Sequence, residues 1–377
     1  MINGGMGTYA EQLVKGLNEK RVDMHVITRG HQTCKDDKLH KINIPNVLYW
    51  RRLFFSKRAV SLFYRLNEVH NFDLVHLNGT YPIIRPLGVP TICTIHGPGN
   101  LKQMKLLLQL KRITSLNDAI FLFLKSPIGF LCDLGTVKFS DKIICPSTSL
   151  VENLSSRWDY IGGREKMVVI PNGIDLKQLD NVRSFPDKVL TTYGIEKDKY
   201  LLYMGRLSFL KGVDYLIEAF KKVQKKYPSL KLVIAGSGDF EPYLRKLSSH
   251  IKSIIFLGFV KSIRLKKILY EGSLAVVLPS AVFEISPMVI IEAMSYGKPV
   301  IATDVGGNRY LIKHGDNGFL SIPRDSENLA HFIHLICRNK ALRKTMGLRG
   351  RILVEKKFTS DLMVNRTLNL YRSLLDR

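Results

Sequence analysis

The sequence lacks paired cysteines, and it lacks any apolar run long enough to cross a bilayer. The five cysteines are scattered, with none of the short paired spacings that metal sites and disulfide frameworks use: Cys34, Cys93, Cys132, Cys145 and Cys337. The most apolar stretch, residues 119–134, is interrupted by Lys125, Pro127 and Asp133. These absences predict a cytoplasmic protein without structural disulfides and without a membrane-spanning helix.

Acidic residues are scarce too, because 57 Lys and Arg face only 32 Asp and Glu, which gives a formal charge of +25. Such an excess indicates an anionic partner of one of three kinds: nucleic acid, a membrane surface or a phosphorylated substrate. No helix-turn-helix, zinc-finger or single-strand-binding motif accompanies the charge, so we expect no nucleic-acid partner. Two basic amphipathic stretches, 49–65 and 101–112, are most simply solvated helix faces; the alternative is contact with an anionic membrane surface.

Regular alternation of apolar strands, glycine turns and helices dominates the rest of the chain. A length of 377 residues suits two domains of ordinary size. Residues 72–77 and 90–95 read as buried parallel strands in the first half, and residues 200–204, 232–235 and 254–257 do so in the second. The pattern predicts an α/β protein with parallel sheets that are covered by helices on both faces.

Residues 278–307 contain the most informative pattern, which reads as strand, loop, helix, strand and loop. Glu284 lies in the first loop, and Glu292 lies in a helix that is apolar nearly all round. We expect Ser286 to cap this helix, Pro287 to occupy its first position and Gly297 to end it. A carboxylate on such a helix must be held by a neighbouring Arg, Lys or amide, or must contact a ligand. The helix N-terminus is itself suited to an anion.

Other candidate residues also follow strands. Arg206 and Lys211 follow the strand at 200–204, so two cations could meet a diphosphate there, although ordinary surface charge is the simpler alternative. His96 follows the strand at 90–95, where open α/β sheets bind ligands, or it merely caps a loop. Gly4 and Gly5 form a glycine turn before a helix, which is weak evidence alone for close approach to a phosphate or sugar.

The two glutamates with seven residues between them, followed by EAMSYGKPVIATDVGG, resemble the signature of the family 4 glycosyltransferases. That resemblance implies the GT-B fold, which has two Rossmann-like doubly wound domains that face a cleft. It places the acceptor-side domain at 1–178, the nucleotide-sugar domain at 179–358, and a helix that crosses back at 359–377. The N-terminal domain lacks its expected first strand, so we expect either a start upstream of Met1 or a truncated copy.

The resemblance also implies roles for the candidate residues. Glu284 would contact hydroxyls of the donor sugar and act at the reaction centre with His96, while Glu292 would contact the ribose. Arg206 and Lys211 would neutralise the diphosphate. The remaining donor-binding positions would be the glycine turn, the start of the helix and the segment beside the base: Gly4, Gly5, Ser286, Pro287, Met288, Phe259 and Val260.

The implied activity is transfer of a sugar from a nucleotide-sugar to a glycan or lipid-linked acceptor, with retention of configuration, in cell-surface polysaccharide or glycolipid biosynthesis. No Asp-x-Asp motif is present, and we expect neither metal nor cofactor. The enzyme would be cytoplasmic and could sit peripherally on the inner face of the membrane. Ile285 and Tyr310 stand where the family commonly has glycine and glutamate, which leaves open a catalytically impaired nucleotide-sugar-binding protein. A nucleotide-sugar epimerase or a phosphorylase of similar fold is the other alternative.

Overall fold

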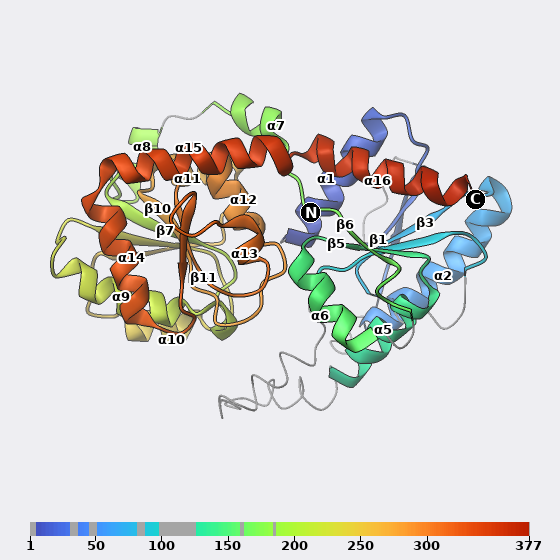
Figure 1. The fold of residues 1–377 in the computed structure, drawn as a ribbon, viewed down its shortest axis with the longest axis horizontal. Coiled ribbons are helices and arrows are strands. Elements are labelled where there is room, and N and C mark those ends of the chain that lie inside the picture. Colours follow the sequence, from blue (N-terminus) through green and yellow to red (C-terminus); the bar gives the residue numbers. More distant parts are fainter. Residues whose placement is uncertain are drawn as a thin grey trace. The chain divides into compact units, whose positions relative to one another are not determined.

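The computed structural model describes residues 5–30, 37–44, 51–80, 87–97, 126–158, 162–183 and 186–376. The chain divides into two compact units (Figure 1). The first unit comprises residues 1–170 and 363–377, and the second comprises residues 171–362. Each unit has its own parallel sheet and its own helices, so the predicted two-domain α/β class is confirmed. The predicted boundaries at 178/179 and 358/359 stay predictions.

The second unit contains a six-stranded parallel sheet in the order β12-β11-β10-β7-β8-β9. Its strands are β7 Tyr200–Met204, β8 Lys231–Ala235, β9 Ile254–Gly258, β10 Ala275–Leu278, β11 Val300–Thr303 and β12 Gly318–Ser321. This is the doubly wound Rossmann order, in which the direction of winding reverses between β7 and β10. The loops after these two strands therefore flank the position where such sheets bind ligands.

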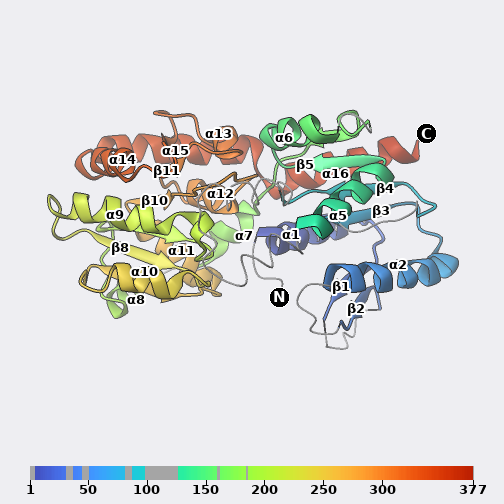
Figure 2. The ribbon, with the colours of Figure 1, turned by 90° about the horizontal axis from the view of Figure 1, so that it is seen from below.

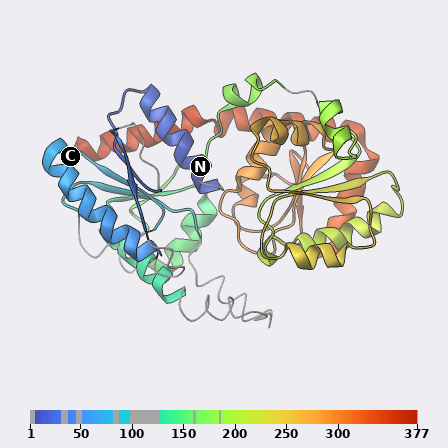
Figure 3. The same ribbon diagram turned by 180° about the vertical axis from the view of Figure 1, so that it is seen from behind.

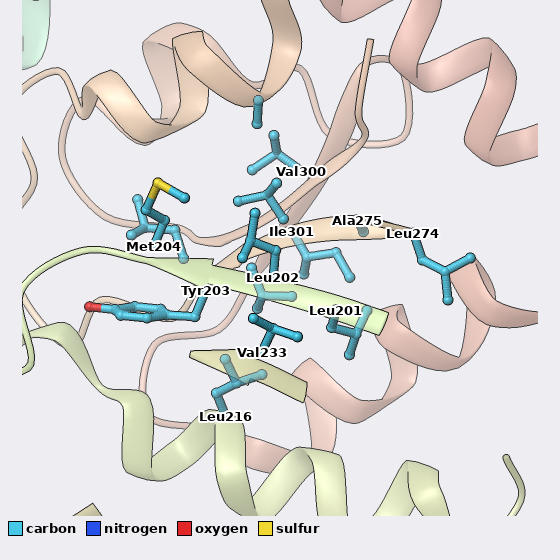
Figure 4. Packing of buried hydrophobic residues seen from close by; sticks show 14 of the residues in the cluster. Leu201, Leu202, Tyr203, Met204, Leu216, Val233, Leu274, Ala275, Val300 and Ile301 are labelled. Carbon is cyan, nitrogen blue, oxygen red and sulfur yellow. The ribbon is translucent and has the colours of Figure 1, made fainter. Parts of the chain in front are cut away.

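The strands of this sheet are apolar, so the sheet packs between two layers of helices. Figure 4 shows part of the core, in which Leu201, Val233, Leu216 and Val300 are all fully buried. The helices of the unit are α7 Leu176–Asn181, α8 Pro186–Thr192, the 3₁₀ turn η3 Phe209–Lys211, α9 Val213–Gln224, α10 Glu241–Leu247, α11 Ile263–Gly272, α12 Met288–Ser295, α13 Asn308–Leu311, α14 Ser326–Arg338 and α15 Lys340–Lys357. Runs of Val, Ile and Leu form the strands because these side chains pack on both faces of a buried parallel sheet.

The sheet of the first unit has the order β3-β4-β5-β6, and a separate parallel pair joins β1 to β2. The strands are β1 Val26–Arg29, β2 Leu39–Ile42, β3 Val75–Asn78, β4 Thr91–Thr94, β5 Lys142–Cys145 and β6 Met167–Val169. Among the described residues, no strand stands between β1 and β3. A Rossmann order has its first strand at that place, and the prediction that this strand is lacking stays a prediction.

The helices of the first unit include one from the end of the chain. They are α1 Gly5–Glu19, α2 Arg51–His70, α5 Ser126–Phe139, α6 Thr148–Trp158 and the part of α16 Ser360–Leu375 from Met363 onward. Tyr9, Leu13 and Leu17 of α1 form a core with Val364 of α16, and the two helices pack together (Figure 3). A Cβ on Gly16 would lie 2.4 Å from Val364 Cγ2, so the glycine permits this close packing.

One expectation for the N-terminal helices needs correction. The helix α1 already begins at Gly5, so Gly5 lies in its first turn and not in a turn before it; Gly4 lies outside the described residues. On α2, Phe55 and Phe63 are buried and contribute to the core, whereas Phe54 is 40% exposed, so contact of this stretch with a membrane surface stays a prediction. The other basic stretch, 101–112, lies outside the described residues. Within the described part of the chain, no helix has both the length and the apolar character needed to span a bilayer.

Candidate functional site

Three loops of the second unit meet around Glu284, in the loop after β10. Lys211, at the end of η3, places its Nζ 2.5 Å from Glu284 Oε1. The Ser280 hydroxyl donates to the same oxygen at 2.5 Å. Glu284 is only 12% exposed, so its charge is compensated by the ammonium and the hydroxyl rather than by bulk water. Among the described residues, Oε2 of Glu284 has no hydrogen-bond donor, which leaves that oxygen for a ligand.

Glycines allow these loops to approach so closely. Gly212 follows Lys211 with φ 63°, and a Cβ there would lie 2.2 Å from the Pro279 carbonyl oxygen. Gly306, in the loop after β11, has φ 48°, and a Cβ there would lie 2.2 Å from the Glu284 carbonyl oxygen. The Gly307 N–H donates to that carbonyl at 2.6 Å. The loop that carries Glu284 is therefore in close contact with two neighbouring loops, and larger residues at Gly212 or Gly306 would displace it.

Arg206 and Phe259 lie at the same edge of the sheet. Arg206 follows β7 and is exposed, and its guanidinium has no hydrogen-bond or ion-pair partner in the part of the chain that the structure describes. The Tyr203 hydroxyl donates to the Arg206 carbonyl at 2.8 Å, which fixes the backbone there. Phe259 follows β9 and is 47% exposed, whereas Val260 is buried. The edge thus presents a free cation and an exposed aromatic ring.

Glu292 is held by a tyrosine. The Tyr270 hydroxyl donates to Glu292 Oε2 at 2.7 Å, and the Tyr270 ring stacks on Tyr296 with centroids 5.3 Å apart. Burial, followed by the nearby Glu292 carboxylate, raises the pKa of Tyr270 well above its usual value, so the hydroxyl remains a donor. The sequence predicted a partner for this carboxylate but named Arg, Lys or an amide. Tyr270 comes from α11, and nothing in the local pattern indicated it.

The predicted cap of α12 is wrong by one position. The helix begins at Met288, and Pro287 is its N-cap with extended ψ 114°, so Ser286 lies one residue too early to cap it. The Ser286 carbonyl accepts from Asn172 Nδ2 at 3.3 Å. Its hydroxyl is buried and has no hydrogen-bond partner among the described residues. An unpaired buried hydroxyl beside a helix N-terminus is available to an anionic ligand. Ile285 is also buried.

His96 belongs to the first unit, where it follows β4. Its Nε2 lies 2.6 Å from Asn78 Oδ1, and because that oxygen accepts, Nε2 carries the proton and Nδ1 keeps its lone pair. The Tyr9 ring meets the imidazole nearly edge-on, with centroids 4.7 Å apart. Burial lowers the pKa of His96 to about 4, so the ring is neutral at pH 7. A neutral ring with one lone pair can accept a hydrogen bond from a ligand hydroxyl.

A second neutral histidine, His76, lies beside His96. His76 Nε2 lies 2.8 Å from Thr94 Oγ1, and Nδ1 lies 2.5 Å from the Tyr371 hydroxyl. Burial, and then the neighbouring His96, lowers the pKa of His76 to about 3. Because the Thr94 hydroxyl also bonds to Tyr9 at 3.0 Å, this chain of hydrogen bonds connects α16 to α1.

These two histidines predict sensitivity to acid. In the unfolded chain they titrate near pH 6.5, so the unfolded state binds more protons as the pH falls below that value. We therefore expect the free energy of unfolding to decrease as the pH falls from about 6.5 toward 4. Urea unfolding at neutral and acidic pH measures this decrease. The decrease should be smaller in His76→Gln than in the wild type. In His250→Gln, which replaces an exposed histidine, the decrease should equal that of the wild type. An equal decrease in the wild type and both variants would contradict the assignment.

The described residues of the second unit thus connect Lys211, Ser280 and Glu284 directly, and they place Arg206, Phe259 and Ser286 after strands of the same sheet. Ser280 was not predicted, although its place two residues after β10 could have indicated it. No group of three or more His, Cys, Asp or Glu in the described ranges is arranged to hold a metal ion.

Two family models match the chain. The model described as Glycosyltransferase Family 4 matches residues 3–178, and the model described as Glycosyl transferases group 1 matches residues 191–352. An uncharacterized glycosyltransferase of Methanocaldococcus jannaschii is 28% identical over 100% of this chain and 96% of its own length. The O-antigen chain mannosyltransferase C of Escherichia coli is 23% identical over 99% of this chain and 95% of its own.

Solved structures with the same fold include a sucrose-phosphate synthase from Thermosynechococcus elongatus, with TM-score 0.77 and 21% identity over 99% of this chain and 94% of that one. The HepE protein of Anabaena, solved with UDP and glucose, has TM-score 0.74 and 19% identity over 99% of this chain and 97% of that one. These likenesses show the GT-B fold. Since the two family models together span most of the sequence, the chain belongs to the family 4 glycosyltransferases.

Proposed function

We propose that this glycosyltransferase takes its sugar from a nucleotide-sugar, transfers it with retention of configuration and without a metal ion, and uses a glycan or lipid-linked acceptor. The observation that carries the proposal is the ion pair between Lys211 and Glu284 at the point where the winding of the sheet reverses. The pair joins a lysine, which is suited to bind a phosphate, to a glutamate, which is suited to bind sugar hydroxyls. The ligands of the Anabaena structure, UDP and glucose, support the same class of donor.

Lys211 can serve both partners at once. Its ammonium has three N–H donors, and the bond to Glu284 uses one of them, so two remain for oxygens of a diphosphate. Arg206, which has no partner in the described part of the chain, and the unpaired Ser286 hydroxyl add further donors. As the bond to the sugar breaks, negative charge builds on the departing diphosphate, and fixed cations stabilise that charge without reorganisation.

The glutamates would orient the donor. Glu284 Oε1 is occupied by Lys211 and Ser280, so Oε2 would accept a hydroxyl of the transferred sugar. Glu292 Oε2 is occupied by Tyr270, so Oε1 would accept a ribose hydroxyl. Phe259, exposed after β9, would lie against the base. Neither glutamate is proposed as a nucleophile, because both are held as hydrogen-bond acceptors; the leaving phosphate would instead take the proton of the acceptor hydroxyl on the same face of the sugar.

We further propose a role in cell-surface polysaccharide or glycolipid synthesis, at the inner face of the membrane. The support is the named activity of the Escherichia coli relative, an O-antigen mannosyltransferase, and the excess of basic residues in this chain. Acceptors of this kind are attached to lipids, so an enzyme that reaches them would work close to anionic headgroups.

Incubation with a panel of nucleotide-sugars tests the proposed function. We expect release of nucleoside diphosphate from at least one donor, unchanged by a chelator, and a product whose anomeric configuration by NMR matches that of the donor. Loss of turnover in the chelator would contradict metal independence, and an inverted product would contradict retention. Binding of nucleoside diphosphate without turnover of any donor would instead indicate an impaired binding protein, in which the buried Ile285 replaces the glycine common in the family.

A further inference from the structure

A basic groove in the second unit lies apart from the residues assigned to the donor. Its lining residues belong to α13, the loop that follows it, and the second half of α15, and its volume is about 540 Å³. Figure 2 shows where α13 and α15 lie in the unit. Five of its lining residues are basic and only Asp316 is acidic: Arg309, Lys313, Arg349, Lys356 and Lys357. Tyr310, which stands where the family commonly has glutamate, also lines the groove.

The positive charge of the groove is not neutralised from within. Arg349 Nη1 lies 2.6 Å from Asp316 Oδ1, so this pair cancels. Arg309 is paired with Asp304, with one bond at 2.9 Å. The three lysines at 313, 356 and 357 have no carboxylate partner within the described residues. Three ammonium groups without a carboxylate partner around one groove attract a compact anion that can accept several hydrogen bonds. Lysine suits a phosphate because its ammonium is a compact charge.

Apolar side chains also line the groove, namely Leu311, Ile352 and Leu353. Ile352 is 38% exposed, and Leu348, which lies outside the groove one turn earlier on the same face of α15, is 59% exposed. The Asn317 side chain is 2% exposed, and its amide is held by the backbone, because it donates to the Leu311 carbonyl at 3.1 Å and accepts from the Lys313 N–H at 2.8 Å. The groove thus offers charge and hydrocarbon contact, while its one amide is buried. This combination favours a phosphate that is attached to hydrocarbon over a glycan.

We propose that the groove binds the phosphate headgroup of an anionic lipid, with Leu348 and Ile352 at the boundary of the acyl chains. The inference rests on the proposed use of an acceptor at the membrane, and it assigns the membrane contact to α13 and α15 of the second unit. Interfacial binding of this type combines buried apolar area with attraction between basic side chains and anionic lipid. Each basic residue near such a surface contributes about fivefold to the affinity, so three lysines contribute about 100-fold.

Vesicle sedimentation of the whole chain tests the proposal. We expect binding to vesicles that contain phosphatidylglycerol, little binding to pure phosphatidylcholine, and a loss of affinity of about 100-fold in a variant with Lys313→Gln, Lys356→Gln and Lys357→Gln. The matched control replaces three other exposed lysines of the second unit, in Lys225→Gln, Lys226→Gln and Lys246→Gln. An equal loss in the control would show that only net charge matters and would overturn the site.

Two further measurements separate the remaining outcomes. Leu348→Ser with Ile352→Ser keeps the charge, and we expect it to weaken vesicle binding; unchanged binding would overturn the apolar contact. Glycerol phosphate in solution, titrated by calorimetry, should bind weakly at most. Binding of this soluble probe that depends on the three lysines, without binding to vesicles, would replace the lipid with a soluble phosphate. No nucleotide-sugar is present in these experiments. Vesicle binding can therefore be absent in a protein that transfers sugar, and present in a protein that turns over no donor.

Discussion

Replacing Glu284 by glutamine is expected to lower kcat/KM for the nucleotide-sugar by about 100- to 1000-fold. The substitution preserves the shape of the side chain but removes the charge that holds the Lys211 ammonium 2.5 Å away. The lysine then lies near an amide, and its position relative to a diphosphate is no longer fixed. The carboxylate oxygen that would orient the sugar is weakened as an acceptor at the same time. Release of nucleoside diphosphate over a range of donor concentrations measures the effect.

Glu218→Gln provides the matched control for this experiment. Glu218 is also paired with a lysine, since Lys221 Nζ lies 2.8 Å from its Oε1, but the two side chains are 42% and 34% exposed and lie on α9 away from the strand ends. Exposed pairs of this kind contribute little to stability, so kcat/KM should remain at the wild-type value. If Glu284→Gln also kept full activity while remaining folded, the proposed role of the ion pair would be wrong.

The substitution Gly212→Ala is expected to reduce the free energy of unfolding by about 2 to 5 kcal/mol. Part of this cost, about 1 to 2 kcal/mol, comes from the left-handed conformation at φ 63°. The rest, again about 1 to 3 kcal/mol, comes from overpacking, because the new Cβ would meet the Pro279 carbonyl oxygen at 2.2 Å. The loops after β7 and β10 would be forced apart, so activity should fall along with stability. Urea unfolding and the donor assay measure the two effects.

Gly194→Ala separates the two causes. Gly194 has φ 64°, nearly the same as Gly212, but a Cβ there would have no atom within 4 Å. Only the cost of the left-handed backbone applies, so we expect a loss of about 1 to 2 kcal/mol and unchanged activity. Equal losses in the two variants would show that the close approach of the loops contributes nothing.

The sequence predicted best what depends on local pattern. The strand at 200–204 was predicted with its observed ends, because five consecutive apolar residues followed by glycine are typical of a buried parallel strand. The cluster around Glu284 followed from the rule that ligands bind at the carboxyl ends of such strands. The positions of Arg206 and Lys211 after β7 were predictable for the same reason.

Features that depend on tertiary contacts were not predicted. The helix α15 was not recognised, because its buried face includes Gly347 and Gly350, which are poor helix formers, and the rest of its surface is basic. These glycines are needed since a Cβ on Gly347 would lie 1.9 Å from the Gly297 carbonyl oxygen. Tyr270, the partner of Glu292, comes from a different helix, and no local spacing reveals such a pair. The prediction that Ser286 caps α12 was wrong because the backbone at Pro287 stays extended.

The core shared by α1 and α16 has a consequence for the order of events during synthesis. Tyr9 and Leu13 pack with Met363, Val364 and Tyr371, so the first unit needs residues that the ribosome adds after the whole of the second unit. The second unit is continuous in sequence and can fold as soon as it emerges. The residues made first therefore complete their core last, and until then their apolar side chains lack the α16 residues that bury them.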